Sequence, residues 1–204
     1  MSAPEAWLQP VTLRSDAAHL VPLDPSHHND LVDAIQDGDL SALWYTHVPK
    51  PTDLAQEIER RLAEHRAGHM LPFAVIEPRS GRAVGMTTFM HVDARNLRVE
   101  IGGTWYRRAV QRSPLNTSCK LLLLTHAFDV LDCIAVELRT HFFNMQSRRA
   151  IERLGAKLDG VLRNHQRAAN GTLRDTCVYS IIQSEWPTVQ AHLTHQLTRP
   201  RNDA

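Results

Sequence analysis

Two stretches of the sequence carry polar side chains whose types and spacing suit the binding of a phosphate and the movement of a proton. The first is residues 111–120, QRSPLNTSCK, which contains no acidic residue and leads from a polar loop into a strongly apolar helix. A helix start presents unpaired N–H groups and a partial positive charge, and together these bind phosphate. We predict that Thr117 or Ser118 caps this helix. An ordinary loop-to-helix junction has the same features and stays open as the alternative.

The second candidate is Glu100, on a predicted strand over residues 97–106. Strict alternation along this strand places Glu100, Gly102 and Thr104 on one face, opposite Val99 and Ile101. The two adjacent glycines of this strand weaken its interior, and such glycines commonly mark a bulge or the close approach of a ligand. Glu100 is therefore a candidate general base beside a place where the sheet opens. A solvated or ion-paired strand glutamate is the alternative.

A third stretch, residues 136–156, is predicted to form a strand, a polar turn and a short helix that ends at Gly155. Asn144 and Ser147 lie at the start of this helix. His141 directly follows the strand, and it is the alternative general base if its side chain reaches the same site as Glu100. For Ser147 the simpler alternative is a capping role on the short helix.

Hydrophobic periodicity predicts the elements that must position these residues. Strands are expected over residues 11–14, 19–23, 71–76, 83–90, 97–106, 134–140, 157–167 and 176–182. Helices are expected over residues 25–38, 53–67, 117–131, 145–154 and 184–197, the last capped by Ser184. Residues 1–9 and 198–204 are expected to be flexible tails of one domain that spans residues 1–204. Between the first two helices, residues 42–49 form an aromatic loop, either a core-packing segment or a wall of the substrate site.

Composition excludes several classes of protein. The chain has 204 residues and a net charge of +1, so no overall field draws it to nucleic acid or to a membrane surface. Its three cysteines show no C-x-x-C spacing, which favours reduced thiols in the cytoplasm. No run approaches the ~20 apolar residues of a membrane helix, and residues 1–10 lack the pattern of a secretory signal.

Taken together, the three stretches resemble the Gcn5-related N-acetyltransferase (GNAT) superfamily, and within it the RimJ/RimL-like, ribosomal-protein alanine acetyltransferase-like branch. The resemblance covers residues 11–197. The motifs that carry it are Glu100-Ile-Gly, residues 111–120, Asn144-x-x-Ser147-x-x-Ala150-Ile-x-x-Leu-Gly155-Ala156, and Gly160-Val-Leu-Arg163.

The resemblance implies a single α/β (α+β) domain with a mixed, mostly antiparallel, splayed sheet of about seven strands flanked by helices. It implies an N-acetyltransferase that uses acetyl-CoA as cosubstrate and needs no metal. A primary amine, either a protein N-terminal amine or a small amine, would attack the thioester directly. The branch resemblance also implies a homodimer, with no nucleic-acid or membrane partner.

By this resemblance, Asn144 contacts the cofactor arm and Ser147 lies near the thioester sulfur, where it is the candidate proton donor to the leaving thiolate. Glu100 is the expected base. The expected cofactor-binding residues are Gln111, Arg112, Ser113, Leu115, Asn116, Thr117, Ser118, Lys120, Gly102, Thr104, Asn144 and Arg149.

The chain departs from the family pattern at two places. The phosphate loop of the superfamily is usually Gln/Arg-x-x-Gly-x-Gly/Ala, whereas residues 111–116 read QRSPLN, without either glycine and with a proline that has no N–H. A tyrosine that often serves as proton donor is also missing. A non-catalytic acyl-CoA-binding module with the same fold is therefore the second hypothesis, and a nucleic-acid-binding protein is a third, disfavoured by the near-neutral charge.

Residues 65 and 69 are histidines at the spacing of metal ligands on a predicted helix, but the sequence offers no third ligand beside them. We therefore expect no metal site. The sequence does not identify the acceptor amine.

Overall fold

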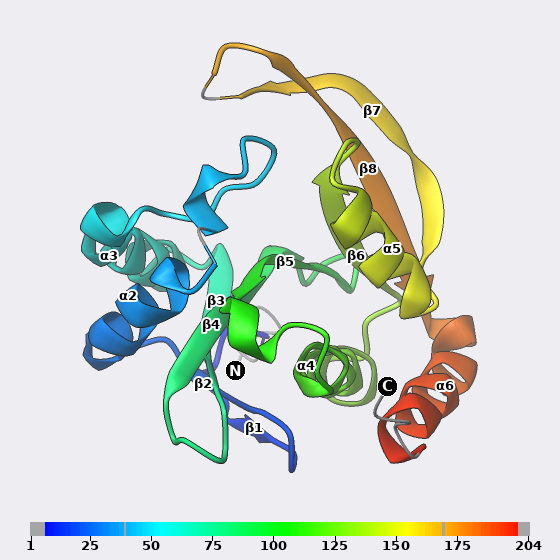
Figure 1. Cartoon of the computed structure of the whole chain (residues 1–204). Coiled ribbons are helices and arrows are strands. Elements are labelled where there is room, and N and C mark those ends of the chain that lie inside the picture. The colour runs from blue at the N-terminus through cyan, green and yellow to red at the C-terminus, as the bar shows by residue number, and fades with distance from the viewer. Residues whose placement is uncertain (1–6, 39, 169, 200–204) are drawn as a thin grey trace.

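The structure, a computed structural model, describes residues 7–38, 40–168 and 170–199. Its eight strands form one mixed sheet in the order β1-β2-β3-β4-β5-β6-β8-β7. All neighbouring strands are antiparallel except β5 and β6, which are parallel. Figure 1 shows the sheet with helices on both sides and with the β7–β8 hairpin extending beyond the rest of the molecule. The predicted mixed, mostly antiparallel sheet is confirmed, with eight strands in place of about seven.

The strands are β1 (Leu13–Arg14), β2 (His19–Pro22), β3 (Met70–Ile76), β4 (Ala83–Asp93), β5 (Arg98–Tyr106), β6 (Ala135–His141), β7 (Lys157–Arg167) and β8 (Leu173–Ile182). The β3 strand is buried along nearly its whole length, which explains its continuous apolar sequence. The β7 strand, at the edge of the sheet, has no fully buried residue.

The helices are α2 (His28–Gln36), α3 (Leu54–Arg66), α4 (Leu115–Thr125), α5 (Met145–Arg153) and α6 (Trp186–Thr198). Short 3₁₀ turns precede α2, α3 and α6, and a π-helical turn over His126–Val130 extends α4. Two expected caps are wrong. The α4 helix begins at Leu115 with Pro114 as N-cap residue, because Pro114 already has helical dihedral angles. The α6 helix follows Glu185, because Gln183–Glu185 form a 3₁₀ turn that includes Ser184.

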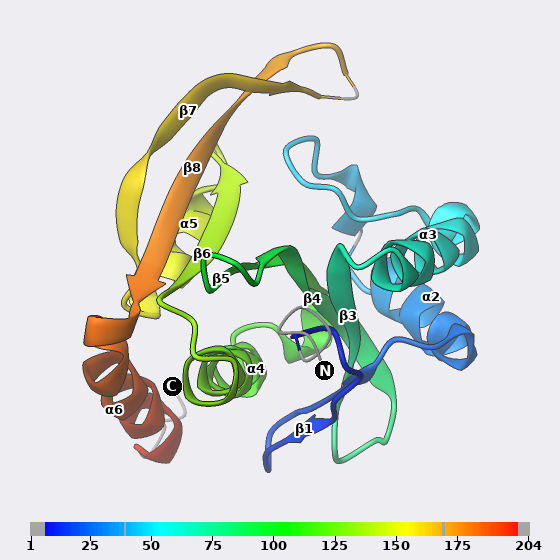
Figure 2. The same cartoon turned by 180° about the vertical axis from the view of Figure 1, so that it is seen from behind.

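Two apolar clusters cover the two faces of the sheet. Side chains of α4, α5 and α6 pack on one face with Phe89, Ile101 and Tyr179. Side chains of α2 and α3 pack on the other face with Met86 and Trp105. Figure 2 shows from behind that α4 lies between the β1–β4 part of the sheet and α6. This central position explains why the first turns of α4 are buried on nearly every side.

The expectation of a loose N-terminal arm over residues 1–9 fails at Trp7. The Trp7 side chain is buried in the larger of the two core clusters, since an indole ring gains more from burial than from exposure. Residues 1–6 and 200–204 of the two expected tails lie outside the described residues. Residue 198 belongs to the end of α6.

Candidate active site

The most distinctive feature of the sheet is the place where β5 and β6 separate. These two parallel strands pair only at Arg98↔Ala135, Val99↔Val136 and Glu100↔Glu137. Beyond Glu100, β5 continues to Tyr106 with β4 on one side and no strand on the other, while β6 continues along β8. Figure 1 shows the two strands diverging above α4. The open edge of β5 offers unpaired backbone groups to an extended ligand, which could bind there as an added strand does.

A β-bulge lies on β5 within this opening. On β4, Met86 pairs with Trp105 and Thr88 pairs with Gly102. The single residue between them, Thr87, therefore faces two residues of β5, Gly103 and Thr104. Gly103 has φ +57°, a left-handed conformation that favours glycine. The extra residue turns Thr104 toward α4, where its hydroxyl lies 2.8 Å from that of Thr87. The bulge suggested by the adjacent glycines is present, but the expected alternation fails at Thr104 because of it.

Arg61, on α3, supports the bulge from the other face of the sheet, and the sequence analysis missed it. Its side chain is almost completely buried; Nη1 donates to Thr88 Oγ1 at 2.7 Å and Nε to Glu57 Oε1 at 2.7 Å. A Cβ atom on Gly103 would lie 3.0 Å from Arg61 Nη1, so the guanidinium occupies the space that a side chain would need. A signal was available: Arg61 follows the buried Ile58 by three positions, which places it on the buried stripe of α3.

The buried positive charge of Arg61 is compensated by the carboxylate of Glu57. Burial lowers the pKa of Arg61, and the neighbouring Glu57 carboxylate opposes that effect. Burial alone would raise the pKa of Glu57, but hydrogen bonds and charge from Arg60 and Arg61 lower it to about 2. The pair therefore stays ionised at neutral pH, and Arg61 is a fixed cation behind the bulge.

Glu100 lies where β5 and β6 begin to separate, and its side chain is only 7% exposed. Its Oε2 atom lies 2.8 Å from His91 Nδ1 and 3.3 Å from Arg139 Nε. Its Oε1 atom lies 2.8 Å from the position that a Cβ atom on Gly102 would occupy, and it forms no hydrogen bond within the described residues. One carboxylate oxygen thus contacts His91 and Arg139, while the other stays available over the glycine.

The loop before α4 is ordered by its own side chains. Gln111 donates its side-chain amide to Tyr106 O at 2.9 Å. The Ser113 hydroxyl donates to Val110 O at 2.6 Å and accepts the Leu115 N–H at 3.2 Å. Arg112 has φ +61°, so it takes the left-handed conformation that glycine usually supplies.

This arrangement leaves donors at the start of α4. The first intrahelical hydrogen bond runs from Ser118 N to Pro114 O, so the N–H groups of Asn116 and Thr117 have no helical acceptor. They form no hydrogen bond elsewhere in the described parts of the chain. With the helix dipole behind them, these two groups form a binding site of the kind that accepts a phosphate.

Two expected cofactor-binding side chains on α4 have other partners. The Lys120 ammonium donates to Thr104 Oγ1 at 2.7 Å and to Thr87 Oγ1 at 3.4 Å, and burial lowers its pKa to about 8. The Ser118 hydroxyl lies 2.6 Å from that of Ser15. The side chain of Lys120 therefore reaches the sheet beneath the bulge, away from the loop. Thr117 and Leu115 are also buried.

Across the opening, the start of α5 presents the remaining expected residues. Asn144 is its N-cap residue and accepts the Ser147 N–H at 3.0 Å through Oδ1. The Ser147 side chain is half-buried, and its hydroxyl forms no hydrogen bond within the described residues. Arg149 is exposed on the same helix. The cap is thus made by Asn144, which leaves the Ser147 hydroxyl free for another role.

His141 ends β6 in an aromatic cluster. Its ring centroid lies 5.1 Å from that of Trp44 and 6.4 Å from that of Tyr45, two residues of the aromatic loop. Its Nδ1 atom accepts the Phe143 N–H at 3.0 Å, so the proton of the neutral ring lies on Nε2. Burial, helped by the charge of Arg174, lowers the pKa of His141. The only basic nitrogen of this neutral ring is therefore already occupied.

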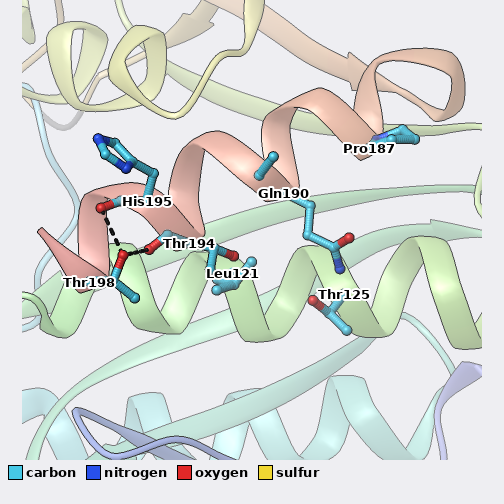
Figure 3. Close-up of a pocket in the computed structure, with 8 residues that line it drawn as sticks. Leu121, Thr125, Pro187, Gln190, Thr194, His195 and Thr198 are labelled. Carbon is cyan, nitrogen blue, oxygen red and sulfur yellow. Dashed lines mark hydrogen bonds between the residues drawn. The ribbon is translucent and has the colours of Figure 1, made fainter.

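Two open cavities lie near these elements. One, of about 570 Å³, is a groove between α4 and α6 (Figure 3). Its lining has no acidic, lysine or arginine side chain, and His195 is its one titratable group. The other, of about 520 Å³, is lined by residues 141–143 and by the β7–β8 hairpin. Neither cavity is lined by Glu100 or by the start of α4, whereas the second contains His141, the alternative base.

Among the described residues, no three histidine, cysteine or acidic side chains gather where a metal ion could bind. His69 contacts Glu64 at 2.8 Å, and His65 contacts Leu8 O at 2.8 Å, so the two histidines have separate partners. None of the helices over the same residues has the length and apolar character needed to cross a membrane.

A splayed sheet, a bulged strand at the split and a helix start with free N–H groups are the features that the resemblance to the GNAT superfamily implies. The family described as "Acetyltransferase (GNAT) domain" matches residues 18–157. The chain therefore belongs to the GNAT acetyltransferase family, as the sequence resemblance indicated.

The comparison with known proteins adds relatives at low identity. YdaF of Bacillus subtilis (strain 168), a candidate ribosomal N-acetyltransferase, is 29% identical over 106 residues, which are 52% of this chain and 57% of YdaF. A GCN5-related N-acetyltransferase from Brucella melitensis has a TM-score of 0.81 at 28% identity over 93% of this chain and 86% of its own. RimJ of Mycobacterium smegmatis, in complex with CoA-disulfide, shares the fold with a TM-score of 0.78 at 19% identity over 93% and 96% of the two chains. Ribosomal-protein acetyltransferases are thus among the sequence and structural neighbours.

Proposed function

We propose that this protein is an acetyl-CoA-dependent N-acetyltransferase that transfers the acetyl group to a primary amine by direct attack on the thioester. The observation that carries the proposal is the opening between β5 and β6, which lies beside the free N–H groups at the start of α4. Membership of the GNAT family supports acetyl transfer as the general reaction.

The residues around the opening fit acetyl-CoA. Its pyrophosphate suits the N–H groups of Asn116 and Thr117, with Arg112 as a charged side chain on the loop. Its amide-bearing arm suits the open edge of β5 at Gly102 and Thr104. The left-handed Arg112 supports the loop conformation without the family glycines, so the departure in sequence does not remove the site. The other expected contacts are Gln111, Ser113, Leu115, Asn144 and Arg149. The side chains of Ser118 and Lys120 are not among them, because they contact Ser15 and the threonines of the sheet.

The side chains of the opening supply the proton transfers. Glu100 accepts a proton from the ammonium of the acceptor through Oε1, which is available over Gly102. The neutral amine attacks the thioester carbonyl carbon, the C–N bond forms, and the C–S bond breaks. Ser147 gives a proton to the departing thiolate, because its hydroxyl is free of the capping role. It takes in return the second proton that the attacking nitrogen loses as the amide forms. Arg61 behind Gly103 holds the bulged strand in place during these steps.

For the acceptor we propose an amine that enters beside Trp44 and Tyr45, the aromatic residues that contact His141. A protein N-terminal amine is the class favoured by the relatives, since YdaF is a candidate ribosomal N-acetyltransferase. We also propose a homodimer and a cytoplasmic location. The three buried free cysteines suit a reducing compartment.

Thiol release from acetyl-CoA, measured with a panel of small amines and peptides, tests the reaction. Calorimetry with Asn116→Asp tests the phosphate site, because the new charge would repel a diphosphate at the start of α4. We expect acetyl-CoA affinity to fall about tenfold or more, a loss of ~1.4 kcal/mol. Asn170→Asp, in the exposed turn between β7 and β8, is the matched control. Tight binding without thiol release would favour the non-catalytic acyl-CoA-binding module, and unchanged affinity in Asn116→Asp would place the pyrophosphate elsewhere.

A further inference from the structure

His91 connects the buried carboxylate of Glu100 to solvent. Its Nδ1 atom lies 2.8 Å from Glu100 Oε2, and its side chain is 63% exposed, whereas that of Glu100 is 7% exposed. The contact joins two strands, since His91 lies on β4 and Glu100 on β5. An imidazole with one nitrogen on a buried carboxylate and an exposed opposite side can carry a proton between the two environments.

The backbone at His91 is built for this contact. β4 and β5 pair at Met90↔Glu100 and next at Asp93↔Arg98, so β4 has two residues where β5 has one. Met90 lies on the face of Glu100, because its Sδ atom is beside Gly102. Regular alternation would send residue 91 to the opposite face. His91 instead has φ +48° in this second bulge, and its ring contacts Glu100. Irregular conformations of this kind are often kept at functional sites.

The other charged groups around Glu100 cannot carry a proton at neutral pH. From β6, Arg139 lies 3.3 Å from Oε2 and also binds Glu137 at 2.8 Å. From β8, Arg174 lies in the electrostatic field of Glu100 and donates to Thr176 at 3.1 Å. A guanidinium holds its proton far above neutral pH, and Glu137 is engaged by Arg98 and Arg139. His91 is thus the titratable partner of Glu100 with a free side in solvent.

We propose that His91 is a relay residue that takes the acceptor's proton from Glu100 and releases it to solvent. This inference rests on the proposed function, in which Glu100 accepts that proton. Rotation of the protonated carboxyl about its Cγ–Cδ bond brings the proton from the Oε1 position to the Oε2 position beside His91. The proton then passes to the lone pair on Nδ1 of the neutral imidazole, and the Glu100 carboxylate is regenerated. The imidazolium then loses the proton on exposed Nε2 to water or buffer. Solvent exchange returns the ring to its starting tautomer. Each turnover moves one proton from the buried site to the bulk.

The test compares turnover at low buffer concentration in four proteins: the wild type, His91→Ala, His91→Asn and His69→Ala. Asn at position 91 tolerates the left-handed backbone and can donate to Glu100, but it cannot carry a proton. His69→Ala is the matched control, because His69 forms a 2.8 Å contact with Glu64 outside the β5–β6 opening. We expect kcat to fall about tenfold or more in both position-91 variants, and added imidazole to restore it. The wild type and His69→Ala should not respond to imidazole, and acetyl-CoA affinity should stay near the wild-type value in every variant. The melting temperature should also stay near that of the wild type in His91→Asn and His69→Ala, whereas His91→Ala has a left-handed residue that alanine tolerates poorly.

Full turnover of His91→Asn at low buffer would overturn the relay, since hydrogen bonding alone would then suffice. A slow His91→Asn that imidazole does not rescue would also overturn it, because His91 would then only hold Glu100 in position. In both cases the wild type still releases thiol, so the proposed function stands. A wild type that binds acetyl-CoA but acetylates no amine in the panel overturns the proposed function and the relay together.

Discussion

Glu100 and His141, which the sequence leaves as alternative bases, differ in how their hydrogen-bonding atoms are used. The basic nitrogen of neutral His141 accepts a backbone N–H, and burial lowers the pKa of the ring. Glu100 keeps Oε1 available beside the open edge of β5. These contacts favour Glu100 over His141 as the proton acceptor.

Glu100→Gln should lower kcat by ~10²-fold or more and leave acetyl-CoA affinity nearly unchanged, because the amide keeps the shape of the side chain and cannot accept the proton. Steady-state kinetics and calorimetry measure these two effects. Retained activity in Glu100→Gln combined with loss in His141→Ala would move the base to His141. If neither substitution matters, positioning of an already neutral amine carries the rate.

The burial of Lys120 can be tested through the pH dependence of the free energy of unfolding. Burial lowers its pKa from 10.5 to about 8, so between these pH values the unfolded chain binds a proton that the folded protein does not. Stability therefore rises as pH increases through this window, and at pH 7 the buried charge costs on the order of 3 kcal/mol. Lys120→Met should be more stable than the wild type at pH 7, and the difference should shrink toward pH 10. The hydroxyls of Thr87 and Thr104 still bond to each other in the variant.

Urea unfolding of both proteins at several pH values measures this difference. The comparison must be between the two proteins, since burial also raises the pKa of Cys119 to about 12, which lowers the stability of both above pH 9. A difference that stays constant with pH would show that Lys120 is not the group responsible.

At the scale of elements, the two bulges of the β4–β5 pair shape the site. The bulge at Gly103 separates Thr104 from the face of Glu100, and the irregularity at His91 brings an imidazole to that face. Between them, Gly102 leaves the space in which Met90 and Glu100 meet. A strand without these irregularities would present neither group in this arrangement.

Gly102→Ala tests that space. The added Cβ atom would lie 2.5 Å from Met90 Sδ and 2.8 Å from Glu100 Oε1, and both are atoms of flexible side chains that can move. We therefore expect a modest loss of stability, below ~1.5 kcal/mol, and a larger effect on kcat through displacement of Glu100. Gly160→Ala is the matched control, because a Cβ atom there meets nothing within 4 Å. Equal activity of the two variants would show that Glu100 needs no exact placement.

Local patterns predicted the elements well and the site only in part. Alternation and helical periodicity predicted the strands and helices, because burial of one face imposes a fixed period on the sequence. The loop before α4 and the bulge at the glycines of β5 were also predicted from the sequence, because residue type there directly determines the backbone conformation. The partners of Lys120, Arg61 and His91 were not, because each depends on contacts between elements far apart in the chain. Lys120 was expected at the phosphate loop because its neighbours are polar, whereas the central position of α4 turns it toward the sheet.

At the scale of the whole molecule, the sheet consists of two parts joined at a narrow seam. The β1–β5 part carries α2 and α3, and the β6–β8 part packs with α5 and α6. Direct strand pairing between the parts is limited to three residue pairs, with α4 packed beside the seam. A ligand in the opening would contact both parts of the sheet, so its binding should stabilise the protein as a whole against unfolding.

Saturating acetyl-CoA should raise the melting temperature by mass action. At a concentration of ~100 Kd the stabilisation is about 2.7 kcal/mol, which for a chain of this size corresponds to roughly 5–10 °C. Asn116→Asp should show a smaller shift at the same concentration, whereas Asn170→Asp should match the wild type. Thermal unfolding with and without acetyl-CoA measures this. No shift at saturation would contradict both the enzyme and the binding-module hypotheses.

The last prediction is self-association into a homodimer. Its support is the resemblance to the RimJ/RimL-like branch, together with large apolar side chains that the single chain leaves exposed. Trp44, Phe143 and Leu173 are 52%, 62% and 49% exposed, and they lie on the aromatic loop, at the start of α5 and on β8. Exposed apolar groups of this size gain free energy when a second surface covers them.

Sedimentation at micromolar concentration should therefore give about twice the 23.1 kDa mass of the chain. Phe143→Ser should shift the equilibrium toward the monomer if this end of the molecule forms the contact, because the exposed ring adds little to the core of the single chain. Val130→Ser is a matched control, since Val130 is equally exposed at 62% but lies at the end of the π-helical turn after α4. Monomer alone at these concentrations would contradict the homodimer. A dimer that responds to Val130→Ser and not to Phe143→Ser would place the contact on the α4 side of the molecule.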